Sequence, residues 1–318
     1  PAIAAGNTVV IKPSERASCS TLELMKILEE ADLPEGLINV VTGFGPTTGA
    51  PLIEHQDVRM ISFTGGTKGG SAASLSASKN VKPIIMELGG KSPQIIFKDA
   101  DLTLSVNGVV SGIFPVSGHS CISGSRILVH KDIKDKFTQN LLEVVKKAKV
   151  GHPNDTATQI GPIANKEQYD FILSKIEAAE KRGLKLLIDG RKEQKSEGYY
   201  IGPTIFDNVP NEDDLAQNEV FGPVASIQTW EDEDEVIKIA NDTIYGLAAG
   251  IWTKDTNKAI RLADKIEAGT VYINNYFNAS TQSPVGGFKQ SGYGRENGWE
   301  GMQSYMQTKS TWLATDPY

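Results

Sequence analysis

Cysteine is scarce in this chain of 318 residues, which contains only Cys19 and Cys121. Small secreted scaffolds depend on several disulfides, so two cysteines in unlike settings argue against that class and favour a reducing cytoplasm. The four histidines stand apart, at positions 55, 119, 130 and 152, and no His, Cys and Asp residues have the spacing of metal ligands. We therefore expect no metal site.

Long apolar runs and an excess of positive charge are also missing. No run approaches the roughly 18 residues that a membrane-spanning helix needs, and no signal peptide heads the sequence. The net charge of −7 argues against nucleic acid or an anionic membrane as a partner, because both bind clustered Lys and Arg. Hydrophobic residues make up 39% of the chain, enough for a substantial core. We expect a soluble, globular, cytoplasmic protein that acts on a small molecule.

One cysteine lies in a segment that suits a nucleophile. The segment 114–126 reads FPVSGHSCISGSR, in which small residues leave the thiol of Cys121 uncrowded. A thiol attacks a carbonyl carbon as the thiolate, so we expect a nearby cation or helix N-terminus to lower its pKa. Taken alone, Cys121 fits a small buried apolar residue better, since free cysteine is among the most buried residue types.

Short apolar runs alternate with helical patterns along the chain. Strands are predicted at 8–12, 38–41, 60–63, 92–97, 127–130, 184–188 and 269–275, and helices at 20–31, 133–148, 166–182 and 231–242. This alternation predicts an α/β fold built on a parallel sheet. The charge-rich segment 189–198 is predicted to be a solvated loop.

Two glycine-containing turns follow strands of the first domain. The segment 43–49, GFGPTTG, is one residue too long for the dinucleotide fingerprint, so we interpret it as a turn. The segment 63–67, FTGGT, closes a strand and opens a helix, whose free N–H groups would suit a pyrophosphate.

Four separated motifs resemble the aldehyde dehydrogenase superfamily in order and spacing. They are ELGGKSP at 87–93, GHSC at 118–121, EVFGPV at 219–224, and PVGGFKQSG with GRE at 284–296. The resemblance runs from Pro1 to about Leu313. It implies a Rossmann-like parallel-sheet cofactor domain at 1–87, an α/β catalytic domain at 88–276, and a C-terminal segment at 277–318 that returns to the domain interface.

The resemblance also implies an assembly and a missing part. The run 308–313 would serve as an oligomerisation strand on the sheet of a neighbouring subunit, giving a homodimer or homotetramer. The chain starts without methionine and runs straight into an apolar strand, so we expect an N-terminal truncation. The family's oxyanion-hole asparagine would then lie upstream of Pro1, and losing one such donor costs on the order of a hundredfold in rate.

The family pattern assigns catalytic roles to three residues. Cys121 would attack an aldehyde to form a thiohemiacetal, which loses hydride to NAD and becomes a thioester. Glu87 would deprotonate the water that hydrolyses the thioester, and Glu296 would pass the proton onward. The product would be a carboxylic acid.

The family pattern also assigns the cofactor contacts. Lys12 and Glu15 would bind the adenosine ribose, and the carboxylate would repel a 2′-phosphate, so NAD is preferred over NADP. Glu219 would contact the nicotinamide ribose and Phe221 would pack near the ring. The full predicted set is Lys12, Ser14, Glu15, Thr64, Gly65, Gly66, Leu88, Gly89, Glu219 and Phe221. Gly66 stands where the family has serine, which removes a hydroxyl but keeps the backbone donors.

Other interpretations stay open. His119 replaces the family's usual glutamine and either fills space or adds a titratable group. A relative that transfers the acyl group to coenzyme A, a catalytically silent relative, and a Cys/His hydrolase built on His119 and Cys121 are the alternatives. The pocket loops, with Phe114, Val116, Ile122 and 276–282, do not choose among aliphatic, aromatic, betaine-type and semialdehyde substrates.

Overall fold

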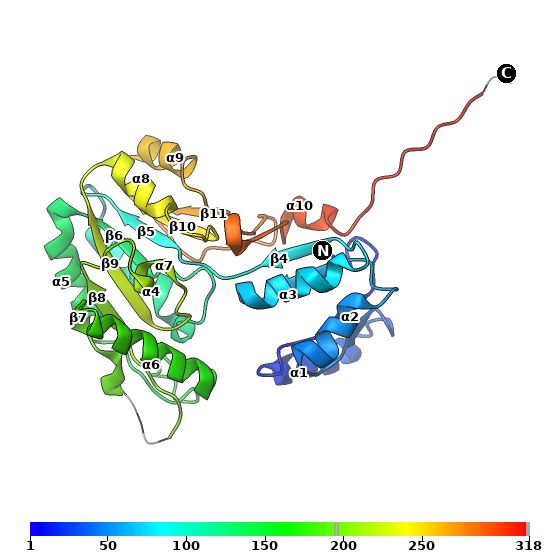
Figure 1. The fold of residues 1–318 in the computed structure, drawn as a ribbon, viewed down its shortest axis with the longest axis horizontal. Helices are drawn as coiled ribbons and strands as arrows, with labels where there is room; N and C mark the ends of the chain where they lie inside the picture. The colour runs from blue at the N-terminus through cyan, green and yellow to red at the C-terminus, as the bar shows by residue number, and fades with distance from the viewer. Residues whose placement is uncertain (194, 196, 316–318) are drawn as a thin grey trace.

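The computed structural model describes residues 1–193, 195 and 197–315, and this part of the chain forms three β-sheets (Figure 1). The first pairs β1 (Val9–Ile11) with β2 (Ile38–Val40) in parallel. The second places β4 (Ile84–Glu87) between the parallel β3 (Ile61–Thr64) and the antiparallel β12 (Gly292–Tyr293). A strand from near the C-terminus thus pairs with the strand that carries Glu87.

The helices of the first third are α1 (Ser18–Glu30), α2 (Ala50–Glu54) and α3 (Thr67–Ser78). The face of α3 that points to the second sheet buries Ala73, which packs with Met86 and Leu88 in a small apolar cluster. Helix α1 buries no residue. The core of this part of the chain is therefore small and lies between α3 and β4.

The third sheet has seven strands in the order β11-β10-β5-β6-β9-β8-β7. They are β5 (Pro93–Ile96), β6 (Arg126–His130), β7 (Lys185–Ile188), β8 (Thr204–Asp207), β9 (Val224–Trp230), β10 (Ala248–Trp252) and β11 (Thr270–Ile273). Every neighbouring pair is parallel except β7 and β8. A parallel sheet needs cover on both faces because its strands are apolar on both sides.

Helices supply that cover. The elements α4 (Leu102–Ile113) and α5 (Lys134–Val145) pack on one face, and α8 (Glu233–Asn241) and α9 (Thr256–Ala263) pack on the other. Successive strand residues alternate between the two cores, so Ile96 belongs to the first and Ile95 to the second. The remaining helices are α6 (Lys166–Lys181), α7 (Asp214–Gln217) and α10 (Gly298–Gln303).

Most predicted elements agree with the structure, and the α/β fold is confirmed. Two segments differ. The predicted turn at 43–49 contains a single π-helical turn, Gly45–Gly49. The predicted solvated loop at 189–198 begins with a short 3-10 helix, Gly190–Glu193, because Arg191 is held there by Asp189 and Glu180; positions 194 and 196 of that prediction lie outside the described residues.

The chain end from 308 to 315 forms no strand and runs away from the other elements (Figure 1). Its Trp312 is 93% exposed. Pairing with a neighbouring subunit and the three domain ranges stay predictions. No helix within the described residues is both long and apolar enough to cross a membrane.

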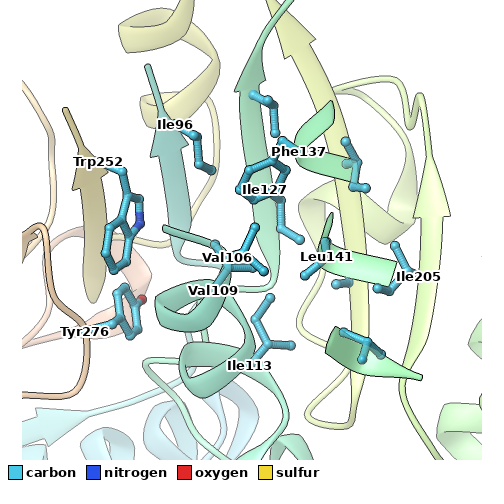
Figure 2. Packing of buried hydrophobic residues seen from close by; sticks show 14 of the residues in the cluster. Ile96, Val106, Val109, Ile113, Ile127, Phe137, Leu141, Ile205, Trp252 and Tyr276 are labelled. Atoms are coloured by element: carbon cyan, nitrogen blue, oxygen red, sulfur yellow. The ribbon is translucent and has the colours of Figure 1, made fainter. Parts of the chain in front are cut away.

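Figure 2 shows the core between the seven-stranded sheet and α4, where Trp252 and Tyr276 lie beside the helix. Gly108 on α4 leaves the space that the Trp252 ring occupies, because a Cβ at this position would overlap the ring. The indole N–H of Trp252 also donates to Gln94 Oε1 at 3.0 Å. The ring is therefore fixed from two sides.

We expect Gly108→Ala to destabilise the protein despite the better helix propensity of alanine. Overpacking against Trp252 should cost about 3 kcal/mol, whereas the propensity gain is about 1 kcal/mol. Urea unfolding should show the net loss of about 2 kcal/mol. Ser111→Ala on the exposed side of α4 is the control and should stay within about 0.5 kcal/mol; an equal effect of both substitutions would contradict the packing argument.

Candidate active site

A strained loop leads from α4 to Cys121. Val116 and Ser117 adopt φ values of 54° and 55°, in the left-handed region that a β-branched residue such as Val rarely occupies. Gly118 follows with φ +72°, and a Cβ there would overlap the backbone of Gly222. Surrounding packing therefore imposes this conformation, as is common at functional sites.

The turn after β4 lies directly against Cys121. Gly90 is so close to the carbonyl group of Cys121 that a Cβ at position 90 would overlap the carbonyl oxygen. Glu87, the last residue of β4, stands three positions before Gly90 in the same turn. On the other side, Tyr276 donates its hydroxyl proton to Ile122 O at 2.7 Å and fixes the residue that follows the cysteine. The predicted nucleophile and base thus come together.

Glu219 lies beneath the same turn. The N–H of Gly90 donates to Glu219 Oε1 at 3.0 Å, and a Cβ at Gly89 would stand 2.5 Å from Oε2. Burial raises the pKa of Glu219, with the Gly90 hydrogen bond and the charge of Lys91 opposing the rise. The Glu219 carboxylate is therefore held against the backbone of residues 89 and 90.

Ser291 of the C-terminal motif forms hydrogen bonds with the same turn. The buried hydroxyl of Ser291 donates to Gly89 O at 2.6 Å and accepts from Gly246 N at 2.9 Å. The N–H of Leu88 donates to Ser291 O at 3.0 Å. Residues that are about 200 positions apart in sequence are thereby joined, and all four predicted motifs meet around one turn.

The base candidate has an altered acidity. Burial, and then the negative charge of Glu296, raise the pKa of Glu87 to about 7, while the charge of Arg295 opposes the rise. Its Oε1 is buried and has no hydrogen-bond partner in the described structure. A carboxyl group with a pKa near neutrality and a free oxygen suits general-base catalysis.

The thiol does not have the electrostatic surroundings that the sequence led us to expect. Burial raises the pKa of Cys121, and the charges of Glu219 and Glu87 raise it further; the backbone N–H groups of Ile122 and Cys121 only partly oppose this. The expectation of a neighbouring cation or helix N-terminus that lowers the pKa is wrong for this structure. The thiol needs a base to take its proton.

Glu296 lies close enough to Glu87 for its charge to act on it, and two hydroxyl groups hold its side chain. Its Oε1 accepts a hydrogen bond from the Ser62 hydroxyl at 2.5 Å and a longer one from the Tyr305 hydroxyl at 3.4 Å. Its like charge acts on Glu87. The three predicted catalytic residues therefore form one group.

The predicted cofactor residues fall into separate groups. At the end of β1, Lys12 Nζ donates to Pro13 O at 2.6 Å and Gly43 O at 3.0 Å, with Glu15 at 3.9 Å, and the Ser14 hydroxyl accepts from the following turn. At the start of α3, the segment 64–66 leaves the helix without a side-chain cap. No hydrogen bond between these two groups occurs among the described residues.

Two further predicted contacts have defined positions. The side chain of Leu88 is buried against Gly70 of α3, which leaves its backbone as the part that borders the turn. Phe221 is partly exposed, at φ 51°, and its ring centroid lies 5.5 Å from that of His119.

His119 adds a polar atom that the sequence did not explain. Its Nδ1 lies 3.1 Å from Val116 O, so the proton of the neutral ring belongs on Nδ1. Nε2 is buried without a partner in the described structure, and burial lowers the pKa of the ring. His119 is therefore a neutral residue with a free acceptor beside Phe221.

Sequence reasoning placed Tyr276 only in a pocket loop, and it did not identify Ser62, Tyr305 or Lys91 as site residues. Lys91 is 2% exposed, and burial followed by the charge of Arg126 lowers its pKa to about 7. Lys91 lies inside the ELGGKSP motif, and this position could have identified it as a site residue. Ser62 and Tyr305 belong to none of the motifs. No group of three or more His, Cys, Asp or Glu residues in the described part of the chain could hold a metal ion.

Comparisons with known proteins give one family. The family described as "Aldehyde dehydrogenase family" matches residues 1–311. An aldehyde dehydrogenase of Emericella nidulans is 46% identical over 98% of this chain and 62% of its own length. The betaine aldehyde dehydrogenase of Bacillus subtilis is 42% identical over the whole of this chain and 65% of its own length.

A solved structure agrees with these relatives. A double mutant of betaine aldehyde dehydrogenase from Staphylococcus aureus, in complex with NAD+, superposes with a TM-score of 0.94 at 40% identity, over 98% of this chain and 63% of that one. The chain thus spans slightly less than two thirds of the length of these proteins.

The raised pKa of Cys121 predicts slow alkylation at neutral pH. In a Cys19→Ser background, the rate of iodoacetamide labelling of Cys121 should reach half its maximum above the pKa of about 8.5 of an ordinary thiol, measured beside N-acetylcysteine. Glu87→Gln removes one of the charges that raise the pKa, so its midpoint should move to lower pH. A parental midpoint at or below that of N-acetylcysteine would contradict the electrostatic description.

Proposed function

Because this chain belongs to the aldehyde dehydrogenase family, we propose that the protein oxidises an aldehyde to a carboxylic acid with Cys121 as nucleophile and NAD as hydride acceptor. The proposal is supported above all by the contact of the Gly90 turn with Cys121, because the same turn begins at Glu87, a carboxyl group with a pKa of about 7. This arrangement suits a reaction in which a covalent acyl intermediate forms and is then hydrolysed.

In the first half-reaction the Cys121 sulfur bonds to the aldehyde carbon. Glu87 accepts the thiol proton at its free Oε1, which avoids the need for a preformed thiolate. The carbonyl oxygen becomes an oxyanion that requires hydrogen-bond donors, and the backbone N–H of Cys121 is one candidate. Once the hydride has left this carbon, Cys121 carries a thioester; a bound NAD would supply the hydride acceptor.

Between the half-reactions Glu87 passes the thiol proton to solvent, and in the second half-reaction it deprotonates a water molecule. The hydroxide adds to the thioester carbon, the carbon–sulfur bond breaks, and the carboxylic acid leaves while the Cys121 thiolate takes a proton from solvent. Glu296, whose charge acts on Glu87, relays the proton that Glu87 has taken. A half-buried base at this place favours hydrolysis over acyl transfer to coenzyme A.

The residues present fit a dinucleotide. The N-terminus of α3 has no side-chain cap, and Gly66 faces open space, since a Cβ there would meet nothing within 4 Å. Such an end suits a pyrophosphate. Lys12 and Glu15 would bind the adenosine ribose, and the carboxylate of Glu15 disfavours a 2′-phosphate, so we propose NAD rather than NADP.

The remaining cofactor contacts follow the family pattern. Ser14 and Thr64 to Gly66 would contact the adenosine and pyrophosphate parts, and Leu88, Gly89, Glu219 and Phe221 the nicotinamide part. Similar solved structures are complexes with NAD+, and this supports the assignment. We further propose a cytoplasmic homodimer or homotetramer; a relative named "Aldehyde dehydrogenase, cytosolic 1" and the exposed apolar chain end at 312–313 support it.

Cys121→Ala should abolish NADH formation and leave NAD binding intact, because the substitution removes the sulfur without disturbing the cofactor contacts. The protein, expressed with its full natural coding sequence, is mixed with NAD and a panel of aldehydes while absorbance of NADH is followed. NAD binding is measured by titration calorimetry. Cys19→Ser is the matched control and should keep parental turnover; turnover by Cys121→Ala would remove Cys121 from the mechanism.

Glu87→Gln should slow acylation, because the base that takes the thiol proton is gone, and should lower the hydrolysis rate about 10²- to 10⁴-fold, so that the acyl-enzyme accumulates once it has formed. Intact-protein mass spectrometry would detect the accumulated adduct on Cys121. In the parent, the base acts as a carboxylate, so hydrolysis should be half-maximal near pH 7 and fall as pH drops below the pKa of Glu87. A rate that is independent of pH between 6 and 8, or an unaltered rate in Glu87→Gln, would exclude this base.

A further inference from the structure

Two hydroxyl groups from distant parts of the chain hold the same oxygen of Glu296. Ser62 on β3 donates to Oε1 at 2.5 Å, and Tyr305, just beyond α10, donates to the same atom at 3.4 Å. Glu296 is anchored at its backbone as well, since its N–H donates to Val285 O and its carbonyl accepts from Val285 N, both at 2.9 Å. The direction of this carboxylate is thus fixed by several elements.

The sheet places one of these donors, Ser62, on the same face as Glu87. In the parallel pairing of β3 and β4, Ser62 is opposite Ile85 and Thr64 is opposite Glu87. Residues two apart on a strand point to the same face, so Ser62 and Glu87 share one face of this sheet. Gly294 packs against Ile85 and brings the chain that leads to Glu296 over that face.

Neighbouring charges have opposite effects on the pKa of Glu87. Glu296 raises the pKa of Glu87, and Arg295 opposes it. The charges of Glu219 and Glu87 both raise the pKa of Cys121. Burial and the charge of Glu296 raise the pKa of Tyr305, so its hydroxyl remains a donor at every pH at which the protein would work.

We propose that Ser62 and Tyr305 are positioning residues for hydrolysis of the acyl-enzyme, because they hold the Glu296 carboxylate where it receives the proton that Glu87 takes from water. The proposal rests on the proposed function. The water proton passes to Glu87, then to Glu296 and then to solvent, so no proton is left on the base after a turnover. Without the two hydroxyls, the carboxylate of Glu296 turns away and its effect on Glu87 weakens.

The test uses the hydrolysis step alone. p-Nitrophenyl acetate acylates a reactive thiol without NAD, and release of nitrophenol followed by decay of the acyl-enzyme can be measured in the full protein between pH 5.5 and 9. Tyr305→Phe and Ser62→Ala are compared with the parent and with Glu296→Gln. We expect the acid limb of the decay rate to move to lower pH by roughly half a unit, as loss of a nearby like charge does. The maximal decay rate should fall about tenfold.

Tyr293→Phe is the matched control. It also removes a tyrosine hydroxyl from the C-terminal part of the chain, but that hydroxyl lies 3.1 Å from Ser74 Oγ and does not reach Glu296. Its pH profile should equal that of the parent. Thermal unfolding of each variant shows whether it folds, and Ser62→Ala provides a second test if Tyr305→Phe does not.

The results separate the two proposals. Unshifted acid limbs in Tyr305→Phe and Ser62→Ala, or an equal shift in Tyr293→Phe, would overturn the positioning role while the dehydrogenase function stands. If the parent forms the acyl-enzyme and the two variants show the expected shift, but the parent makes no NADH with any aldehyde, the positioning role is supported and the proposed function is refuted. A parent that is not acylated at Cys121 would overturn both.

Discussion

The close approach of the Gly90 backbone to the Cys121 carbonyl is the constraint on which the site depends. Any side chain at position 90 would push the two segments apart. In the same turn Gly90 donates a hydrogen bond to Glu219, and Gly89 accepts one from Ser291. These two glycines therefore make all three long-range contacts. A loss of backbone freedom at this turn would therefore disturb Cys121, Glu87 and Glu219 together.

Two carboxyl groups, Glu219 and Glu87, act on the thiol of Cys121, and a third, Glu296, acts on Glu87, so the negative charges of this site oppose one another's formation. Glu219 and Glu87 disfavour the thiolate, and Glu296 disfavours the carboxylate of Glu87. Like charges in a half-buried place cannot all form at once. A positively charged ligand would reduce this repulsion and favour the ionised forms of these groups.

The sequence predicted the parts of the fold and site that depend on local pattern. The strand at 61–64 and the helices at 18–30 and 166–181 follow apolar periodicity, and Cys121, Glu87 and Glu219 stand in short motifs. Ser62 and Tyr305 could not be found in this way, because each reaches Glu296 through tertiary folding, over 234 positions in the case of Ser62. The pKa of Cys121 also depends on carboxylates brought near by folding, which is why its direction was wrongly expected.

The pairing of β4 with β12 has a consequence for synthesis on the ribosome. Gly292 is the partner of Glu87, so the edge of β4 that carries the base stays open until the end of the C-terminal motif has been translated. Chains that emerge N-terminus first tend to fold in that order, and an unpaired strand edge invites contacts with other chains. A nascent chain of this protein therefore exposes this strand edge and is prone to association through it until the C-terminal motif has been translated.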